Sequence, residues 1–138
     1  MKSELPNKAC PVIIRDQGCI EILAFEHPLA GFQLVKGTIE PGENSRDAAL
    51  RELREESGLH ASKVVADLGT WLSGYNDQIW AFHLCDAGSP PESWTHRTSD
   101  DGGHDFKFFW HALSQKPNDH WHWVFQKALQ YIFRKLVT

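Results

Sequence analysis

Three glutamates, Glu52, Glu55 and Glu56, follow Arg51 at the spacing of one helical face. Residues three and four apart lie side by side on a helix, so a helix here would project the three carboxylates together. Like charges on one face repel each other unless a cation lies among them. Carboxylate oxygens are ligands that hard divalent cations prefer. The run therefore indicates a divalent-metal site or, alternatively, a solvated acidic helix face that pairs with Arg51 and Arg54.

This run ends a longer pattern between Gly37 and Leu59, which reads GTIEPGENSRDAALRELREESGL. A glycine, five residues, a glutamate and seven residues precede the series RELREESGL. The pattern resembles the Nudix box at every fixed position: G-x5-E-x7-R-E-U-x-E-E-x-G-U, where U is a bulky aliphatic residue. The chain is therefore identified as similar to the Nudix hydrolases, and among them to the small MutT-like members.

The resemblance implies an α/β class fold, the Nudix fold, in which a mixed β-sheet is sandwiched between helices. We expect residues 1–138 to form one such domain, which the chain length allows. The implied reaction is hydrolysis of a phosphoanhydride bond in a nucleoside diphosphate linked to another moiety. Nucleoside triphosphates, dinucleoside polyphosphates and nucleotide sugars are substrates of this type. The implied cofactor is Mg²⁺, with Mn²⁺ as the alternative.

Two other functions stay open at this point. The same chemistry would serve an RNA 5′-end pyrophosphohydrolase, although a net charge of −4 and a pI near 6.0 disfavour a long nucleic acid partner. A catalytically silent nucleotide sensor is the second alternative. Such a protein would be expected to lose box carboxylates, whereas this chain keeps all of them.

The match to the family assigns a role to each box residue. Glu55 and Glu56 are expected as direct metal ligands, and Glu52 as a third ligand or as the general base. The carbonyl of Gly37 is a candidate backbone ligand, because glycine permits close approach. Arg51 precedes Glu55 by four residues and is expected to orient that carboxylate, so the predicted catalytic set is Glu52, Glu55 and Arg51.

Residues outside these positions are further candidates. Glu43 would anchor the loop through Arg51 or reach a second metal ion through water. Lys36, immediately before the box, would contact phosphate or lie at the surface. Trp94 would stack on a nucleobase or anchor its loop against the domain. The general base could also come from the segment 86–104 or just beyond it, where the candidates are Glu92, His96, Asp100, Asp101, His104 and Asp105; His104 is also a candidate substrate contact.

Hydrophobic patterning predicts the elements that position these groups. Strands are expected over 10–15 and 19–25, joined by a turn at Asp16-Gln17-Gly18, and over 32–35. A helix is expected from Asn44 or Ser45, one of which would be the N-cap, to Ser57, with Gly58 just after its end. Further strands are expected at 64–72, 78–85 and 105–111.

The segment 86–104 is rich in Pro, Ser, Gly and Asp, which predicts a long functional or mobile loop without regular structure. Asp119 is expected to cap a final helix, begun by Trp121 and Trp123, which would pack against the sheet. An apolar stripe on this helix is expected to face the core; its members are Val124, Phe125, Ala128, Leu129, Ile132, Phe133 and Leu136.

Composition limits the partners and the compartment. Cys10, Cys19 and Cys85 lie in or beside apolar runs without metal-ligand spacing, so buried reduced thiols in a cytoplasmic protein are expected. No signal peptide or membrane span is expected, because Met1–Lys8 is polar and no apolar stretch is long enough. The expected partner is a small nucleotide-type molecule, with no long nucleic acid and no membrane, bound by a monomer or homodimer.

Overall fold

The computed structural model describes residues 5–61, 63–99 and 102–137. The strands in chain order are β1 (Lys8–Val12), β2 (Ile14–Asp16), β3 (Ile20–His27), β4 (Gly31–Gln33), β5 (Gly37–Thr38), β6 (Lys63–Leu72), β7 (Ile79–Asp86), β8 (Trp94–Thr98) and β9 (His104–Ala112). Helix α1 (Ser45–Ser57) lies between β5 and β6, and helix α2 (Trp123–Val137) follows β9.

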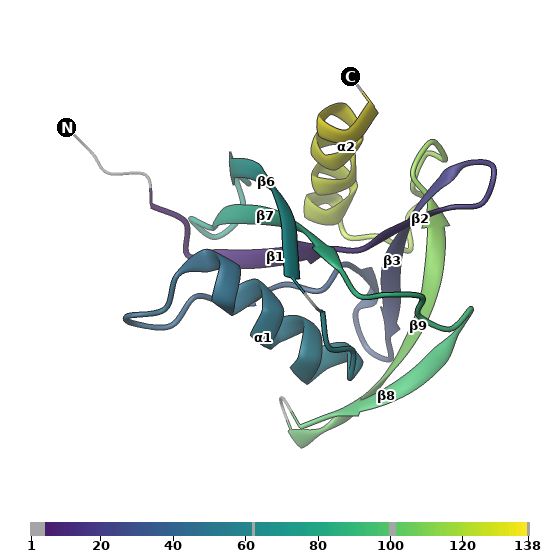
Figure 1. The fold of residues 1–138 in the computed structure, drawn as a ribbon, viewed down its shortest axis with the longest axis horizontal. Coiled ribbons are helices and arrows are strands. Elements are labelled where there is room, and N and C mark those ends of the chain that lie inside the picture. The colour runs from purple at the N-terminus through teal and green to yellow at the C-terminus, as the bar shows by residue number, and fades with distance from the viewer. Residues whose placement is uncertain (1–4, 62, 100–101, 138) are drawn as a thin grey trace.

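The described strands form two sheets between the two helices. The first has the order β5-β1-β7-β6 and is mixed, because β1 and β7 run parallel while the other pairs are antiparallel. The second is antiparallel, with the order β2-β3-β9-β8 and with β4 paired to β3. Figure 1 shows α1 and α2 on opposite sides of these strands. This arrangement is the α/β/α sandwich that the resemblance implied, with its strands divided between two sheets.

Each helix covers one half of the core. The apolar stripe of α2 buries Val124, Phe125, Ala128, Leu129 and Ile132, which pack with buried residues of β1, β3 and β7. Leu53 of α1 belongs to a second cluster, with apolar side chains of β3, β7 and β9. The stripe prediction is therefore confirmed for the five buried members and for Leu136, which is partly buried and packs against their cluster, while Phe133 is exposed.

The predicted N-terminal hairpin exists, but its first arm is divided between the two sheets. β2 pairs with β3 around the turn, where the Asp16 carboxylate accepts the backbone N–H of Gly18. β1 instead pairs with β7 and β5. A continuous apolar run such as 10–14 fits strands of either sheet, so composition does not show where the chain crosses between them.

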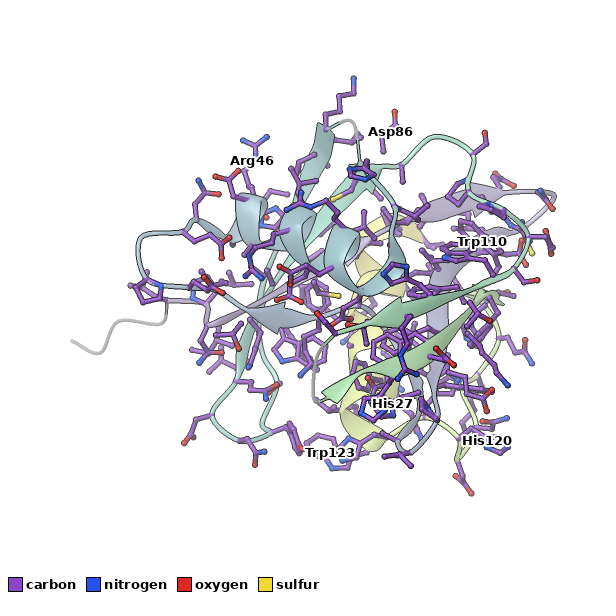
Figure 2. All side chains as sticks on the ribbon, turned by 90° about the horizontal axis from the view of Figure 1, so that it is seen from below. His27, Arg46, Asp86, Trp110, His120 and Trp123 are labelled. Atoms are coloured by element: carbon purple, nitrogen blue, oxygen red, sulfur yellow. The ribbon has the colours of Figure 1, made fainter. Side chains whose placement is uncertain are left out.

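Several predictions about loops and ends were wrong. β8 lies inside the segment 86–104, because residues 94–98 pair antiparallel with β9. Helix α2 begins at Trp123, so Asp119 does not cap it; the ring Nδ1 of His122 accepts the N–H of Val124. Trp121 is buried before the helix, whereas Trp123 is 46% exposed and lies at the periphery, as Figure 2 shows.

The cysteine prediction is correct for two of the three residues. All three cysteines lie in the described part of the chain and are free thiols. Cys10 and Cys85 are buried, and burial raises the pKa of Cys85 to about 11. Cys19 is exposed beside the β2–β3 turn. Of the described helices, neither combines the length and apolarity that a membrane crossing requires.

Candidate active site

Helix α1 is defined by caps at both ends. Asn44 is the N-cap, with extended backbone angles and a side-chain oxygen that accepts the N–H of Asp47 at 2.9 Å. Gly58 follows the last helical residue at φ 78°, a left-handed conformation that glycine adopts without steric cost. The predicted boundaries are confirmed, since local capping chemistry fixes them.

The carboxylates of α1 differ in their exposure. Glu52 and Glu56 are buried, at 7% and 9% exposed, on the same helix that buries Ala48, Ala49 and Leu53. The Glu55 side chain is 44% exposed. Two of the three carboxylates are therefore shielded from bulk water. In this buried environment a negative charge needs compensation and interacts more strongly with a cation.

Arg51 provides part of that compensation. Its guanidinium donates to both Glu43 oxygens at 2.9 Å, to Glu52 at 2.9 Å and to Glu55 at 3.3 Å. A further bond, at 2.9 Å, reaches the carbonyl of Thr38. The hydrogen bonds from Arg51 lower the pKa of Glu43 from its ordinary 4.5 to about 2. Arg51 thus links the loop to the helix, and of the two roles predicted for Glu43 the structure shows the anchor.

Gly37 lies directly against the Glu52 carboxylate. A Cβ atom added at Gly37 would lie 1.9 Å from Cδ of Glu52, so the Glu52 carboxylate would have to leave its present position to admit a side chain at residue 37. Gly37 is held there by strand β5, where it pairs with Ala9 of β1. The absence of a side chain at this position therefore allows the backbone before the loop to approach the acidic face of α1.

These residues fit a hard divalent cation by donor chemistry. They supply carboxylate oxygens and a backbone carbonyl, the ligand types that Mg²⁺ and Mn²⁺ take. Among the described residues, no three His, Cys, Asp or Glu side chains already form a metal cage. Mg²⁺ usually keeps several waters and takes few carboxylates, so a preformed cage is not required for it.

A cavity of about 210 Å³ lies beside the box, with Lys36 in its wall. The other lining residues are Ala30, Gln33, Tyr75, His122, Val124 and Phe125. The Lys36 ammonium donates to the Gln78 side chain at 3.3 Å and lies 5.1 Å from the centre of the Trp80 ring. Lys36 is thus partly buried, with its ammonium held by Gln78 and Trp80, and a contact with phosphate stays a prediction.

The carboxylates of α1 also affect the pKa of Lys36. Burial lowers the pKa of its ammonium, and the charge of Lys8 lowers it further, while the negative charges of Glu56 and Glu52 partly oppose this. Lys36 therefore lies in the wall of the cavity and within electrostatic reach of Glu52 and Glu56. A second cavity, of about 320 Å³, is lined by residues 113–117 and by α2. None of its lining residues adjoins 37–59, whereas Lys36 of the first cavity directly precedes that segment.

Sequence reasoning missed Tyr75 and His122, which line the first cavity, and Gln78, which accepts a hydrogen bond from Lys36. Asn76 and Asp77 have φ values of 49° and 57°, and the N–H of Gln78 bonds to the carbonyl of Tyr75 at 2.9 Å. Two consecutive positive φ values form a type I′ turn, which joins β6 to β7 and places Tyr75 and Gln78. The Asn-Asp pair was the available signal, because these residues tolerate left-handed backbone. His122 had no comparable signal.

The comparison with protein families decides which family this fold and box belong to. The model of the NUDIX domain matches residues 6–129. The chain belongs to the Nudix family. Nudix hydrolases generally use divalent metal ions and act on small nucleotide-type substrates.

Individual relatives match over shorter segments. Nudix hydrolase 25 of Arabidopsis thaliana is 40% identical over 42 residues, which are 30% of this Nudix chain and 24% of that protein. An RNA pyrophosphohydrolase of Cereibacter sphaeroides is 38% identical over 74 residues, covering 50% of this chain and 46% of the relative. The matches thus span less than half the length of these two relatives.

A solved structure extends the similarity of fold to nearly the whole chain. The binary complex of a C. elegans Ap4A hydrolase is similar with a TM-score of 0.66 and 21% identity, covering 94% of this chain and 97% of that one. The Nudix fold is therefore shared beyond the box.

The alternative base candidates of this Nudix chain are mostly engaged away from α1. Glu92 accepts two hydrogen bonds from Arg15, at 2.6 and 3.0 Å. Asp105 pairs with Arg97 at 3.3 Å. His104 lies against the ring of His27, with 4.9 Å between ring centroids. Asp100 and Asp101 lie outside the described residues.

Trp94 and His96 both contact the end of α1. The indole N–H of Trp94 donates to the carbonyl of Ser57 at 2.9 Å, and its ring stacks on Phe108. The ring Nε2 of His96 lies 3.1 Å from the carbonyl oxygen of Glu55. Of the two predicted roles of Trp94, these contacts are those of an anchor; a stacking role toward a nucleobase stays a prediction.

Proposed function

We propose that this Nudix protein is a Mg²⁺-dependent pyrophosphohydrolase, with Mn²⁺ as an effective substitute, that cleaves a phosphoanhydride bond in a nucleoside diphosphate derivative. The observation that carries the proposal is the close approach of Gly37 to Glu52 on the face that also presents Glu55 and Glu56. A solvated acidic helix face would not require a glycine in contact with a buried carboxylate. That contact supports a site built for a ligand.

Glu55, Glu56 and the Gly37 carbonyl would hold the metal ion, and Glu52 would act as the general base. When bound, such an ion neutralises charge on the phosphates and makes a water molecule more acidic. Arg51 holds Glu52 and Glu55 in place through its hydrogen bonds, so it acts on the carboxylates instead of on the substrate. Lys36 contributes a partly buried positive charge in the cavity wall, within electrostatic reach of Glu52 and Glu56, where the phosphates of a substrate would need one.

Glu52 is the proposed general base. Its carboxylate is buried against Gly37 and receives one hydrogen bond from Arg51, which fixes its orientation. The competing acids Glu92 and Asp105 are paired with Arg15 and Arg97, and His96 is directed at a backbone carbonyl. These engagements support a base on α1, where it can take a proton from water next to the cleaved bond.

The cavity beside Lys36 is the proposed site for the moiety joined to the diphosphate. Tyr75 and Phe125 provide aromatic surface, and the amide of Gln33 provides hydrogen-bonding groups. This combination suits a planar heterocycle such as a nucleobase, which stacks on rings and is recognised at its polar edge. The same cavity would exclude substrates whose second moiety is bulky in all directions.

A substrate-panel hydrolysis screen tests the proposal. The panel contains nucleoside triphosphates, dinucleoside polyphosphates, nucleotide sugars and a short RNA with a 5′-triphosphate, each with Mg²⁺ and with Mn²⁺. We expect cleavage of at least one small nucleotide into two phosphate-bearing products, abolished by EDTA. Binding without cleavage across the panel would instead support a nucleotide sensor and contradict the enzyme proposal.

RNA 5′-end processing is the second candidate function. It is favoured by the 38% identity to an RNA pyrophosphohydrolase over half of the chain. The net charge of −4 works against retention of a long polyanion. A kcat/KM for the 5′-triphosphate RNA that exceeds that of every small nucleotide would establish this candidate in place of the first.

We also propose a cytoplasmic location. The three cysteines are free thiols, of which two are buried, and this supports a reducing compartment.

A further inference from the structure

The last turn of α1 carries Glu55 and Glu56, and its backbone ends in carbonyls that helical bonding leaves free. The final carbonyls of any helix lack an intrahelical N–H partner. Here the N–H of Gly58 satisfies the carbonyl of Arg54 at 2.9 Å. The carbonyls that follow, including those of Glu55 and Ser57, need donors from elsewhere. These are the carbonyls next to the carboxylates proposed to bind metal.

Strand β8 supplies two of these donors. Trp94 donates its indole N–H to Ser57 at 2.9 Å, and the imidazole Nε2 of His96 lies 3.1 Å from the carbonyl oxygen of Glu55. Because a carbonyl can only accept, His96 must carry a proton on Nε2. Trp94 and His96 are two residues apart, so they extend from the same side of β8. The two side chains of this strand therefore bond to carbonyls of the same turn of α1.

Both donors are themselves fixed. The Trp94 ring stacks on Phe108 of β9, with centroids 4.9 Å apart and planes 7° apart. His96 packs against Gly58, where an added Cβ would lie 2.9 Å from the ring Nδ1. Gly58 therefore serves two purposes, since it adopts the left-handed angle and leaves space for the imidazole. Figure 1 shows the C-terminal end of α1 directed toward β8.

We propose that Trp94 and His96 are positioning residues that orient the Glu55–Glu56 turn for metal binding. This inference builds on the proposed function, because it assigns a purpose to the carboxylates of that turn. Neither side chain needs to touch metal or substrate. A shift of the turn would move both carboxylates together, so the contacts from β8 would set how well they share one cation.

The test compares four variants with the wild type. Trp94→Phe keeps an aromatic ring for stacking but removes the donor, and His96→Leu removes the imidazole. His96→Gln retains an N–H that can reach the Glu55 carbonyl. Thr95→Val is the matched control, because Thr95 lies between the two residues and is exposed.

Three measurements are made: Mn²⁺ affinity of the substrate-free protein, amide hydrogen exchange of residues 55–59, and kcat with KM at saturating metal. Loss of groups that orient metal ligands typically weakens metal affinity about 10–100-fold. We expect about tenfold weaker Mn²⁺ binding and faster exchange in Trp94→Phe and in His96→Leu, lower kcat with unchanged KM, and recovery in His96→Gln. The Thr95→Val protein should match the wild type.

Wild-type Mn²⁺ affinity and wild-type exchange in both Trp94→Phe and His96→Leu would overturn the proposal. A merely structural role would lower the melting temperature without changing Mn²⁺ affinity well below it, and that result also counts against the proposal. If the wild type hydrolyses nothing in the panel, the proposed function fails on that result alone. The metal titration and the exchange data then still decide whether β8 positions the turn.

Discussion

The segments 37–59 and 86–104 contribute to the same site in different ways. In 37–59, caps, ion pairs and the acidic face are all visible in the order of the residues. In 86–104, proline, glycine and serine suggest a loop, yet residues 94–98 form a strand that contacts the first segment. The first segment supplies the chemical groups, and the second contacts the backbone that carries two of them.

The difference shows which kinds of interaction are local. Residues of β8 alternate between partly covered and exposed, with Trp94, His96 and Thr98 on the covered side. Five residues are too few for this alternation to outweigh the turn-forming residues around them. The strand forms because β9 offers it hydrogen bonds and because Phe108 stacks on Trp94. The following predictions test this division between the two segments.

The largest effect is expected from the carboxylates of 37–59. Glu56→Gln and Glu55→Gln, each nearly isosteric, should lower kcat/KM about a hundredfold or more, because each removes a negative ligand for a metal that stabilises phosphate charge. The melting temperature should change little. Glu26→Gln, at an exposed site on β3, is the control. Hydrolysis rates and thermal unfolding are measured together; unfolded variants would mean that the acidic face is structural.

The next effect tests the close approach of Gly37. Gly37→Ala should lower activity more than tenfold and destabilise the fold by about 1–3 kcal/mol, because the added methyl overlaps the buried Glu52 carboxylate. Gly42→Ala is the control for backbone strain alone, since its methyl meets no atom within 4 Å but its φ of 79° strains an alanine. Urea unfolding and hydrolysis assays separate overlap from backbone strain. A loss of activity in Gly37→Ala no greater than that in Gly42→Ala would remove the argument from Gly37.

A smaller effect is expected from Glu43, and it depends on pH. Hydrogen bonds from Arg51 lower its pKa from 4.5 to about 2, so it adds stability above pH 4.5 that is lost as pH falls toward 2. Glu43→Gln should therefore flatten the decline of melting temperature between about pH 4.5 and 2. Thermal unfolding across this range measures the slope. A variant with the wild-type slope would show that the pair does not couple to folding.

The smallest effect is expected from Glu92 in the second segment. Like Glu43 it pairs with an arginine, but its side chain is 76% exposed, compared with 17% for Glu43. Exposed pairs contribute about 0–1 kcal/mol, so Glu92→Gln should change the melting temperature by only a few degrees and leave kcat/KM unaltered. Loss of activity would make Glu92 a catalytic group. The chemical groups of the site would then come from both segments and not from 37–59 alone.

The sequence predicted much of the fold and the acidic face of the site. It placed α1 correctly, because Asn44 and Gly58 act on their own neighbours, and it placed β6, β7 and β9 closely. It failed at β8 and at the start of α2, where distant partners decide. It also failed to find Tyr75 and His122, which meet at the cavity from segments about 47 residues apart.

The sequence by itself determined the family, the caps of α1 and the presence of three carboxylates on one helix. Each of these depends on residues within the one segment 37–59, where spacing along the chain indicates which groups can meet. Only the tertiary structure decided that Gly37 contacts Glu52 and that Lys36 lines a cavity. It also decided that Trp94 and His96 bond to the last turn of α1. Those contacts join residues far apart in sequence, and packing of the two sheets between the helices brings them together.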